Sequence, residues 1–343
     1  MKNSFMAKIP ACTRRDRITG FSLLELTVAM LLGLLVSGSA LSIFISNRQL
    51  QRATESISNI QEKARTAFDL IAQDVREAGG NPCGRNVLFG SVVNNQSDVW
   101  WASLRRPLFG YGAGTSMPDV GFGKDAGQRV DGTDAVEIKS VDAGIVRVID
   151  HDPVSARFRV NNNVDIHRGD VAVACDGSQI TVFQVTDASF GTDASVYHSA
   201  AENTVPGNCS AGLGFPARCH TGGTPHQYPA NSTLGKLHAS RWYIGNNAHG
   251  GTSLYQSTLR NTGGTVAVFN EEVVDAVDDM QIRYLLGGAT DYVAADAVPT
   301  DRWGLVRSVR IHMIFSASEA QQSPVGKRNR DLMQIVTLRN RLP

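Results

Sequence analysis

Residues 20–35 read GFSLLELTVAMLLGLL, and this stretch begins an apolar run that continues to Ile45. Between Leu26 and Ile45 the chain has no charged residue. Twenty residues of α-helix rise about 30 Å, which is the thickness of the hydrocarbon core of a bilayer. The stretch therefore predicts a helix with a membrane segment at about residues 21–45.

The residues ahead of this run are basic. Asp16 is accompanied by five positive side chains, which are Lys2, Lys8, Arg14, Arg15 and Arg17. Positive residues before a membrane segment favour retention of that end on the cytoplasmic side, so we expect the remainder on the other side. The whole chain is +1 and residues 1–20 carry 5 − 1 = +4, so the rest carries 1 − 4 = −3. That charge lacks the basic signature of nucleic-acid binding, and no nucleic-acid partner is expected.

Glu25 is the unusual residue of the apolar run. A carboxylate inside an apolar helix costs a few kcal/mol on membrane-insertion scales and usually has a function. Two simpler interpretations give it none. One is a secretory signal peptide, for which Gly38-Ser39-Ala40 offers a small-residue cleavage site. The other is a plain membrane anchor.

The pattern Gly20-Phe21-x-x-x-Glu25, after a short basic leader and before an apolar stretch, resembles the processing site of type IV pilins and pseudopilins. The resemblance implies that a prepilin peptidase cleaves between Gly20 and Phe21 and methylates the new amine of Phe21. Glu25 would then lie about one helical turn from that amine. In an assembled filament its carboxylate could neutralise the terminal amine of a neighbouring subunit and set the register between subunits.

The predicted helix continues beyond the membrane segment. No proline occurs from Phe21 to Gly80. Apolar residues recur at steps of three and four, which predicts one face of an amphipathic helix: Leu50, Ala53, Ile57, Ile60, Ala64, Ala67 or Phe68, Ile71 and Val75. Gly79-Gly80 is a plausible end, since glycine readily adopts the left-handed conformation there. The predicted organisation is therefore a cleaved leader at 1–20, a helix at 21–79 and a head at 80–343.

The head is predicted to be rich in β-strands, so the fold class is α+β and type IV pilin-like. Residues 170–187 indicate a hairpin around Asp176-Gly177. Two stretches rich in turn-forming residues, 107–133 and 201–233, are expected to be long surface loops available for partner contacts. The other strand-like segments are 134–141, 144–149, 156–162, 240–246, 252–260, 280–286, 306–318 and 332–340.

The head contains an even number of cysteines: Cys83, Cys175, Cys209 and Cys219. Four cysteines allow three pairings. The short Cys209–Cys219 spacing favours that pair first, which leaves Cys83 with Cys175. Disulfides suit an oxidising compartment, such as the periplasm or the cell surface. A zinc site that adds His220 or His226 is the alternative, although the close CxxC pairs of common zinc modules are missing.

Signatures of enzymes and cofactors are weak. The sequence has no GxSxG or HExxH motif and no phosphate-binding glycine loop. Residues 131–134 (DGTD) and 275–279 (DAVDD) could contact calcium, but neither matches the EF-hand pattern. We therefore expect no catalysis, no cofactor and no metal.

Two further stretches refine the resemblance. The helix end AQDVREAGGNPCG (72–84) resembles the PilW family of minor pilins. The stretches EEVVDAVDDMQIRYLL (271–286) and RWGLVRSVRIHMIF (302–315) are similar to C-terminal strands shared by PilW-type minor pilins and the J-type pseudopilins of type II secretion. The size of the chain favours the PilW type.

A PilW-type resemblance implies a minor pilin that joins a priming or tip complex and initiates type IV pilus assembly. The implied partners are other minor pilins, the major pilin, the prepilin peptidase, the inner-membrane assembly platform and a tip adhesin. The protein would span the inner membrane of a Gram-negative bacterium once, with its head in the periplasm, and would later reach the pilus and the cell surface. Twitching motility and cell adhesion are the processes implied. The alternatives are a J-type pseudopilin of type II secretion and a DNA-uptake pilin, which the negative mature chain disfavours.

Overall fold

The computed structural model of the protein describes residues 20, 22–84, 87–96, 99–142, 146–200, 203–219, 223–316 and 330–341. Most of the leader, including Cys12, and also Phe21 lie outside these residues. The chain divides into two compact units, Met1–Glu55 and Ser56–Pro343. Helix α1, Leu23–Glu77, is continuous across the boundary between them.

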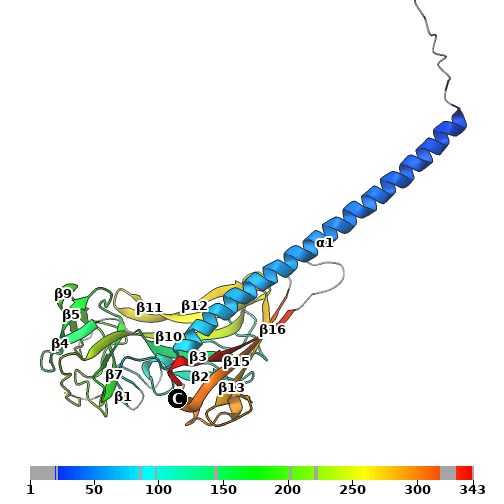
Figure 1. The fold of residues 1–343 in the computed structure, drawn as a ribbon. Coiled ribbons are helices and arrows are strands. Elements are labelled where there is room, and N and C mark those ends of the chain that lie inside the picture. Colours follow the sequence, from blue (N-terminus) through cyan, green and yellow to red (C-terminus); the bar gives the residue numbers. More distant parts are fainter. Residues whose placement is uncertain are drawn as a thin grey trace, which may run out of the picture. The chain divides into compact units, whose positions relative to one another are not determined.

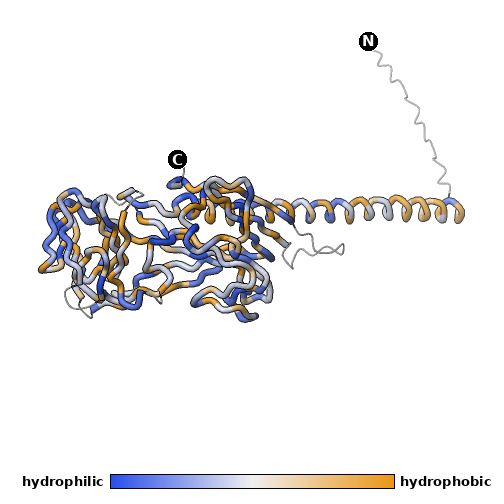
Figure 2. The backbone as a smooth tube through the Cα atoms, turned by 90° about the horizontal axis from the view of Figure 1, so that it is seen from below, coloured by the Kyte–Doolittle hydropathy of each residue, from blue (hydrophilic) through white to orange (hydrophobic). Residues whose placement is uncertain are grey.

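The N-terminal half of α1, up to Ile45, is apolar and exposed. Figure 2 shows mostly hydrophobic colour toward the N-terminal end of the helix. Among the described residues, α1 is the one helix that is long and apolar enough to cross a membrane, judged by length and composition, and none of its apolar window is buried. Leu23, Leu34 and Val36 have 81%, 75% and 69% of their surface exposed. So large an apolar surface is unfavourable in water, and it indicates lipid or other helices as its natural surroundings.

Strands dominate the described part of the second unit (Figure 1), and the predicted α+β fold class is confirmed. Three-residue 3-10 turns lie at Trp100–Ala102, Ala295–Ala297, Trp303–Leu305 and Arg339–Arg341. The strands are β1 (Leu88–Ser91), β2 (Leu108–Tyr111), β3 (Ala135–Val141), β4 (Val146–Asp152), β5 (Arg157–Asn163), β6 (Val171–Cys175), β7 (Gln179–Gln184), β8 (Asp187–Ala188), β9 (Gly191–Tyr197), β10 (Thr233–Asn246), β11 (Thr252–Thr262), β12 (Thr265–Asp275), β13 (Val277–Leu286), β14 (Val293–Ala294), β15 (Val306–Phe315) and β16 (Arg330–Thr337).

Strand β10 joins the two halves of the larger sheet. Its first residues pair with β6 over Thr233–Lys236 on one edge and with β4 over Thr233–Leu234 on the other. Its later residues pair with β3 and β11. The strands β1, β7, β6, β4, β5, β9 and β8 therefore extend from one end of β10, and β2, β3, β11 and β12 extend from the other. Figure 1 shows β4, β5 and β9 at one end of the head and β13 and β15 toward the other.

The second sheet is antiparallel, in the order β14-β13-β15-β16. One hydrophobic core lies between this sheet, the larger sheet and α1. It contains the buried face of the second sheet, the α1-facing side of β3, β10 and β11, and the last turns of α1. Ile60, Ala67 and Ile71 on α1 are almost completely buried there. The Phe68 ring lies 6.3 Å from the Phe315 ring of β15. From Ile60 onward, the apolar stripe predicted along α1 is thus the face that contacts both sheets, whereas Leu50 at its start is 68% exposed.

Most predicted strands are present, with two revisions. The segment 240–246 is only the second half of β10, which begins at Thr233. The loop expected at 107–133 contains β2, which pairs with β3 and is buried over most of its length. The hairpin around Asp176-Gly177 is present as β6 and β7.

One polar residue lies on the buried face of α1. Asp74 is only 8% exposed. Its Oδ2 accepts hydrogen bonds from Ser240 Oγ at 2.6 Å and Trp242 Nε1 at 2.7 Å, with Gln256 Nε2 at 3.4 Å, while His238 Nε2 lies 3.4 Å from Oδ1. Burial raises the pKa of Asp74, but the hydrogen bonds from His238, Ser240 and Trp242 lower it further, so the carboxyl pKa lies below its ordinary value. The carboxylate therefore fixes the end of α1 to β10.

We expect Asp74→Asn to lower the free energy of unfolding by about 2–4 kcal/mol, because it removes the buried charge that satisfies several donors. The measurement is chemical denaturation of the full chain in detergent, followed by tryptophan fluorescence. Asp69→Asn is the matched control, because Asp69 lies on the exposed face and its side chain is 64% exposed. The control should change stability by less than about 0.5 kcal/mol. Equal effects of the two substitutions would contradict this role of Asp74.

Candidate functional site

The predicted processing site lies just ahead of α1. Gly20 is exposed and non-helical, and the first described helical hydrogen bond runs from Leu26 N to Ser22 O at 3.1 Å. Phe21, on the other side of the predicted cut, lies outside the described residues. A protease binds an extended substrate more readily than a helix, so the position of Gly20 before the first turn suits cleavage there.

Glu25 lies in the first turn of α1. A carboxylate at this position interacts favourably with the positive end of the helix dipole. Its exposed neighbours on the same stretch are Ser22, Leu24, Val28, Ala29 and Leu32. Glu25 is thus the one charged group among these mostly apolar residues. That arrangement can pair with a cation carried by an otherwise apolar partner surface.

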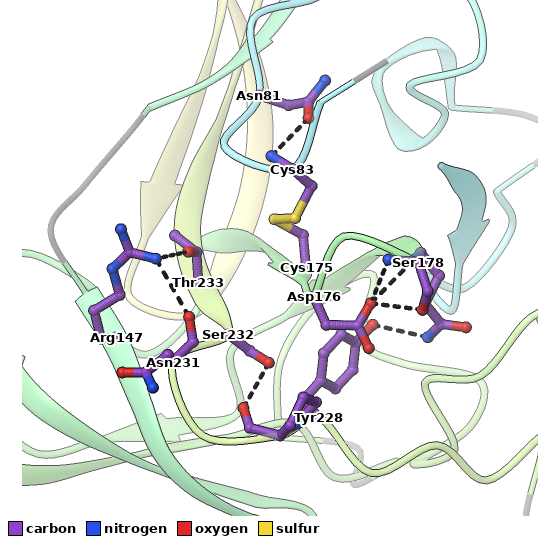
Figure 3. The surroundings of a disulfide bond; sticks show 12 residues. Asn81, Cys83, Arg147, Cys175, Asp176, Ser178, Tyr228, Asn231, Ser232 and Thr233 are labelled. Carbon is purple, nitrogen blue, oxygen red and sulfur yellow. Dashed lines mark hydrogen bonds between the residues drawn. A yellow bond between two sulfur atoms is a disulfide. The ribbon is translucent and has the colours of Figure 1, made fainter. Parts of the chain in front are cut away.

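Two disulfides hold the described loops of the head, and they are the two pairs that the spacing favoured. Cys83, in the loop after α1, is bonded to Cys175 at the end of β6 (Figure 3). Cys209 is bonded to Cys219 within the loop before β10. In Figure 3, Asn81 Oδ1 accepts a hydrogen bond from Cys83 N at 3.0 Å, which fixes the loop beside the disulfide. The first disulfide therefore ties the end of α1 to the larger sheet.

The described residues considered for metals have other partners. The cysteine sulfurs are in disulfides, and His226 Nε2 lies 2.6 Å from Asp176 Oδ2. His220 lies outside the described residues. Across the part of the chain that the structure describes, no group of three or more His, Cys, Asp or Glu residues could hold a metal ion. Asp134 accepts a hydrogen bond from Ile282 N, and Asp275 pairs with Lys63 on α1.

The face of β10 opposite Asp74 carries a buried charge network that the sequence analysis missed. Glu137 on β3 contacts Lys139 Nζ at 2.8 Å, Arg241 Nη2 at 2.9 Å and Tyr111 OH at 2.7 Å. Each of these four residues is at most 6% exposed. Burial raises the pKa of Glu137, but the neighbouring Lys139 and Arg241 lower it further, so it lies below the ordinary value. The alternation of polar residues along β3 and β10 is the feature of the sequence that could have predicted this network.

This network anchors the long segment between β1 and β3. Arg241 Nη1 donates to Pro118 O at 2.7 Å, and Lys139 Nζ donates to Ser103 O at 3.0 Å. The Arg241 guanidinium also lies 4.0 Å from the centre of the Trp100 ring. With every charge engaged in this way, the network holds structure and does not present a reactive group.

A second buried polar cluster contains two histidines. His151 Nε2 lies 3.0 Å from His198 Nε2, and both residues are at most 1% exposed. His151 Nδ1 accepts a hydrogen bond from Tyr228 N at 3.1 Å, so the proton of a neutral His151 is on Nε2. His198 Nε2 must then be the acceptor and its proton must be on Nδ1. The pair connects β4 and the end of β9 to the chain that enters β10.

Residues 241–336 match the family model of PilW, type IV pilus-assembly protein W. Over this segment the chain is similar to the PilW family of pilin-related proteins. No curated protein and no solved structure matches the chain. The match supports a relation to type IV pilus assembly. Together with the apolar helix, it also indicates membrane anchoring.

The PilW segment overlaps much of the part of the head that packs on α1. It begins at Arg241 and includes Trp242, which donates to Asp74. It continues through β11, β12, β13 and β15 to Val336, near the end of β16. The lobe formed by β4 to β9 lies outside the match. The PilW segment therefore supplies many of the residues that pack on the helix, together with β2, β3 and the first half of β10.

The histidine pair predicts a loss of stability in acid. Burial lowers the pKa of His151 to about 4 and that of His198 to about 3. Between these values and about 6.5, the unfolded chain binds protons that the folded chain does not. Stability is therefore complete above about pH 6.5 and falls as the pH decreases. The expected loss is on the order of 2 kcal/mol per histidine by pH 5, measured by denaturation of the full chain in detergent.

Two variants separate this effect from general acid sensitivity. His151→Gln with His198→Gln should flatten the stability profile between pH 6.5 and 5, because glutamine does not titrate. His249→Gln, at an exposed turn, should leave the profile unchanged. A wild-type profile that is flat over this range would show that the buried pair does not resist protonation.

Proposed function

We propose that this PilW-family protein is a minor pilin that joins a priming or tip complex and initiates type IV pilus assembly. One observation carries the proposal: the exposed apolar helix, which begins just after Gly20, continues without interruption into a core to which the PilW segment contributes. A plain anchor would not need that continuity. A continuous helix is needed in a subunit whose helix packs against other helices and thereby fixes the position of its head.

The proposed mechanism begins with cleavage of the leader, residues 1–20, between Gly20 and Phe21 and with methylation of the Phe21 amine. The apolar part of α1 then leaves the lipid and packs against like helices. Glu25 pairs with the terminal amine of a neighbour within that packing. Since a buried carboxylate that loses its partner is strongly destabilised, the pair sets the axial register of the subunits.

The proposed location follows from the same features. The basic leader favours a cytoplasmic N-terminus, with one membrane span and a head in the periplasm. The two disulfides suit that oxidising compartment. The proposed partners are the prepilin peptidase, the assembly platform, the major pilin and other minor pilins, with a tip adhesin at the end of the filament.

Substitution of Gly20 tests the processing step. Gly20→Ser, or a bulkier residue, should block cleavage, because the peptidase accepts glycine before the cut. The full-length chain should accumulate in membranes, and its mass should be measured by mass spectrometry. Gly33→Ser, within the same apolar run, is the matched control and should be processed normally. A mature-sized product from the Gly20 variant would remove the assignment to a prepilin peptidase.

Substitution of Glu25 tests the assembly step in a strain that lacks the gene. Glu25→Val should still be processed, but sheared surface pili should fall at least about tenfold, since a lost buried ion pair costs about 3–5 kcal/mol. Glu55→Val, in the same helix but outside the apolar run, should restore pili. Secreted enzymes should be assayed in the same cultures. Normal pili with lost secretion would assign the protein to a type II secretion pseudopilus instead.

A further inference from the structure

A cavity of about 290 Å³ lies at the end of α1, within the second unit. It is at the lower limit of the roughly 300–1,000 Å³ usual for small-molecule sites, so it suits a side chain better than a cofactor. We call it the arginine cavity. Its lining residues include Gly80, Phe89, Arg105, Pro107 and Arg339.

The described lining contains two positive side chains and no acidic one. Arg105 and Arg339 are both exposed. Within the described part of the chain, neither guanidinium donates a hydrogen bond or forms an ion pair, whereas Arg241 is fully engaged with Glu137. Two unpaired guanidinium groups that border one cavity offer several donors in the planar arrangement that a carboxylate matches.

The walls of the cavity are fixed before any ligand arrives. Gly79 N donates to Lys139 O at 2.9 Å, Val141 N donates to Gly80 O at 2.8 Å, and Lys139 N donates to Pro107 O at 2.7 Å. The Cys83–Cys175 disulfide holds the loop that follows (Figure 3). Three separate segments are thereby attached to β3 or β6. Such preorganisation lowers the entropic cost of binding.

The floor of the cavity also has little room for side chains. A Cβ at Gly80 would lie 2.8 Å from Glu77 O and 2.9 Å from Asn340 Nδ2. Gly79 has a φ of 73° and Gly84 a φ of 92°, which disfavours other residues at both positions. The backbone conformation at these glycines therefore determines the space beside the two arginines. Replacing a glycine by a larger residue would not fill that space without strain.

The chemistry of the site favours a carboxylate over a phosphate. Phosphate sites typically use the N–H groups of a helix N-terminus, but the helix end at this cavity is a C-terminus and presents carbonyl oxygens. A doubly charged anion would be repelled there more strongly than a singly charged one. Phe89, Leu104 and Pro107 supply apolar surface for the methylene groups of a glutamate.

We propose that the arginine cavity receives an acidic side chain, glutamate or aspartate, from another type IV pilus-assembly subunit. The identity of the partner rests on the proposed function, whereas the preference for a carboxylate rests on Arg105 and Arg339. The contact would fix a neighbouring subunit to the end of the helix that also carries Asp74. It would thereby join subunits at the head, independently of Glu25.

The first test is a titration of the full chain in detergent, followed by NMR of the arginine Nε–H groups. The probe is the peptide acetyl-Gly-Glu-Gly-amide, and its glutamine counterpart and inorganic phosphate are the comparisons. The glutamate peptide should shift the Arg105 and Arg339 signals saturably and bind at least tenfold more tightly than the glutamine peptide. Arg105→Gln with Arg339→Gln should abolish binding. Arg283→Gln, an exposed residue of β13 outside the cavity, should leave it unchanged.

Three results would overturn the carboxylate site: equal binding of the two peptides, tighter binding of phosphate than of the glutamate peptide, or unchanged binding to the double variant. The partner is tested in cells. Arg105→Glu with Arg339→Glu should reduce sheared pili at least tenfold, while Arg283→Glu should not. Normal pili in the double variant would exclude a pilus subunit as the partner. The Gly20 and Glu25 variants leave the cavity intact, so they test the proposed function separately.

Discussion

The hydrogen bonds between Asp74 and β10 are the constraint on which the head depends. A buried carboxylate is tolerated only where donors surround it, and His238, Ser240 and Trp242 supply them from alternate positions of a single strand. Because these three side chains share one face, a shift of β10 by one residue would remove them all. The carboxylate therefore fixes both the rotation of the last turns of α1 and the register of the strand beneath it.

That register extends further because β10 is bordered by four strands. Its opposite face places Arg241 against Glu137, so each face of β10 carries its own buried charge arrangement. Replacing buried ion pairs by apolar residues is often neutral or stabilising, whereas breaking them is costly. We therefore interpret the Asp74 hydrogen bonds and the Glu137–Arg241 network mainly as features that select one packing of helix, strand and loop. Their contribution to net stability is secondary.

The sequence predicts the parts of this fold that repeat with a regular period. The steps of three and four along residues 50–75 predicted α1 and the stripe that is buried from Ile60 onward, and alternating or apolar segments predicted most strands. Asp74 could have been found, since it lies one turn from Ile71 on that stripe. The first half of β10 could not be predicted from the sequence. Gly235 and Lys236 interrupt the alternation of apolar and polar residues, and the strand is paired on both edges. The His151–His198 contact joins residues far apart in the chain and has no local signal. The arginine cavity was equally hidden, because three separate segments form it.

The position of β10 also affects how the head is made. In a chain synthesised from its N-terminus, β3, β4 and β6 are all made before β10, the strand that pairs with them. Val141 of β3, for example, cannot pair until Leu237 of β10 has been synthesised. Closing such long loops has an entropic cost before the pairing can stabilise it, which slows folding. Until residues 233–246 arrive, these strands have open edges that can pair with other chains. The nascent head therefore depends on protection from aggregation until nearly three-quarters of the polypeptide has been produced, and a truncation before β10 would leave an aggregation-prone fragment in place of a smaller domain.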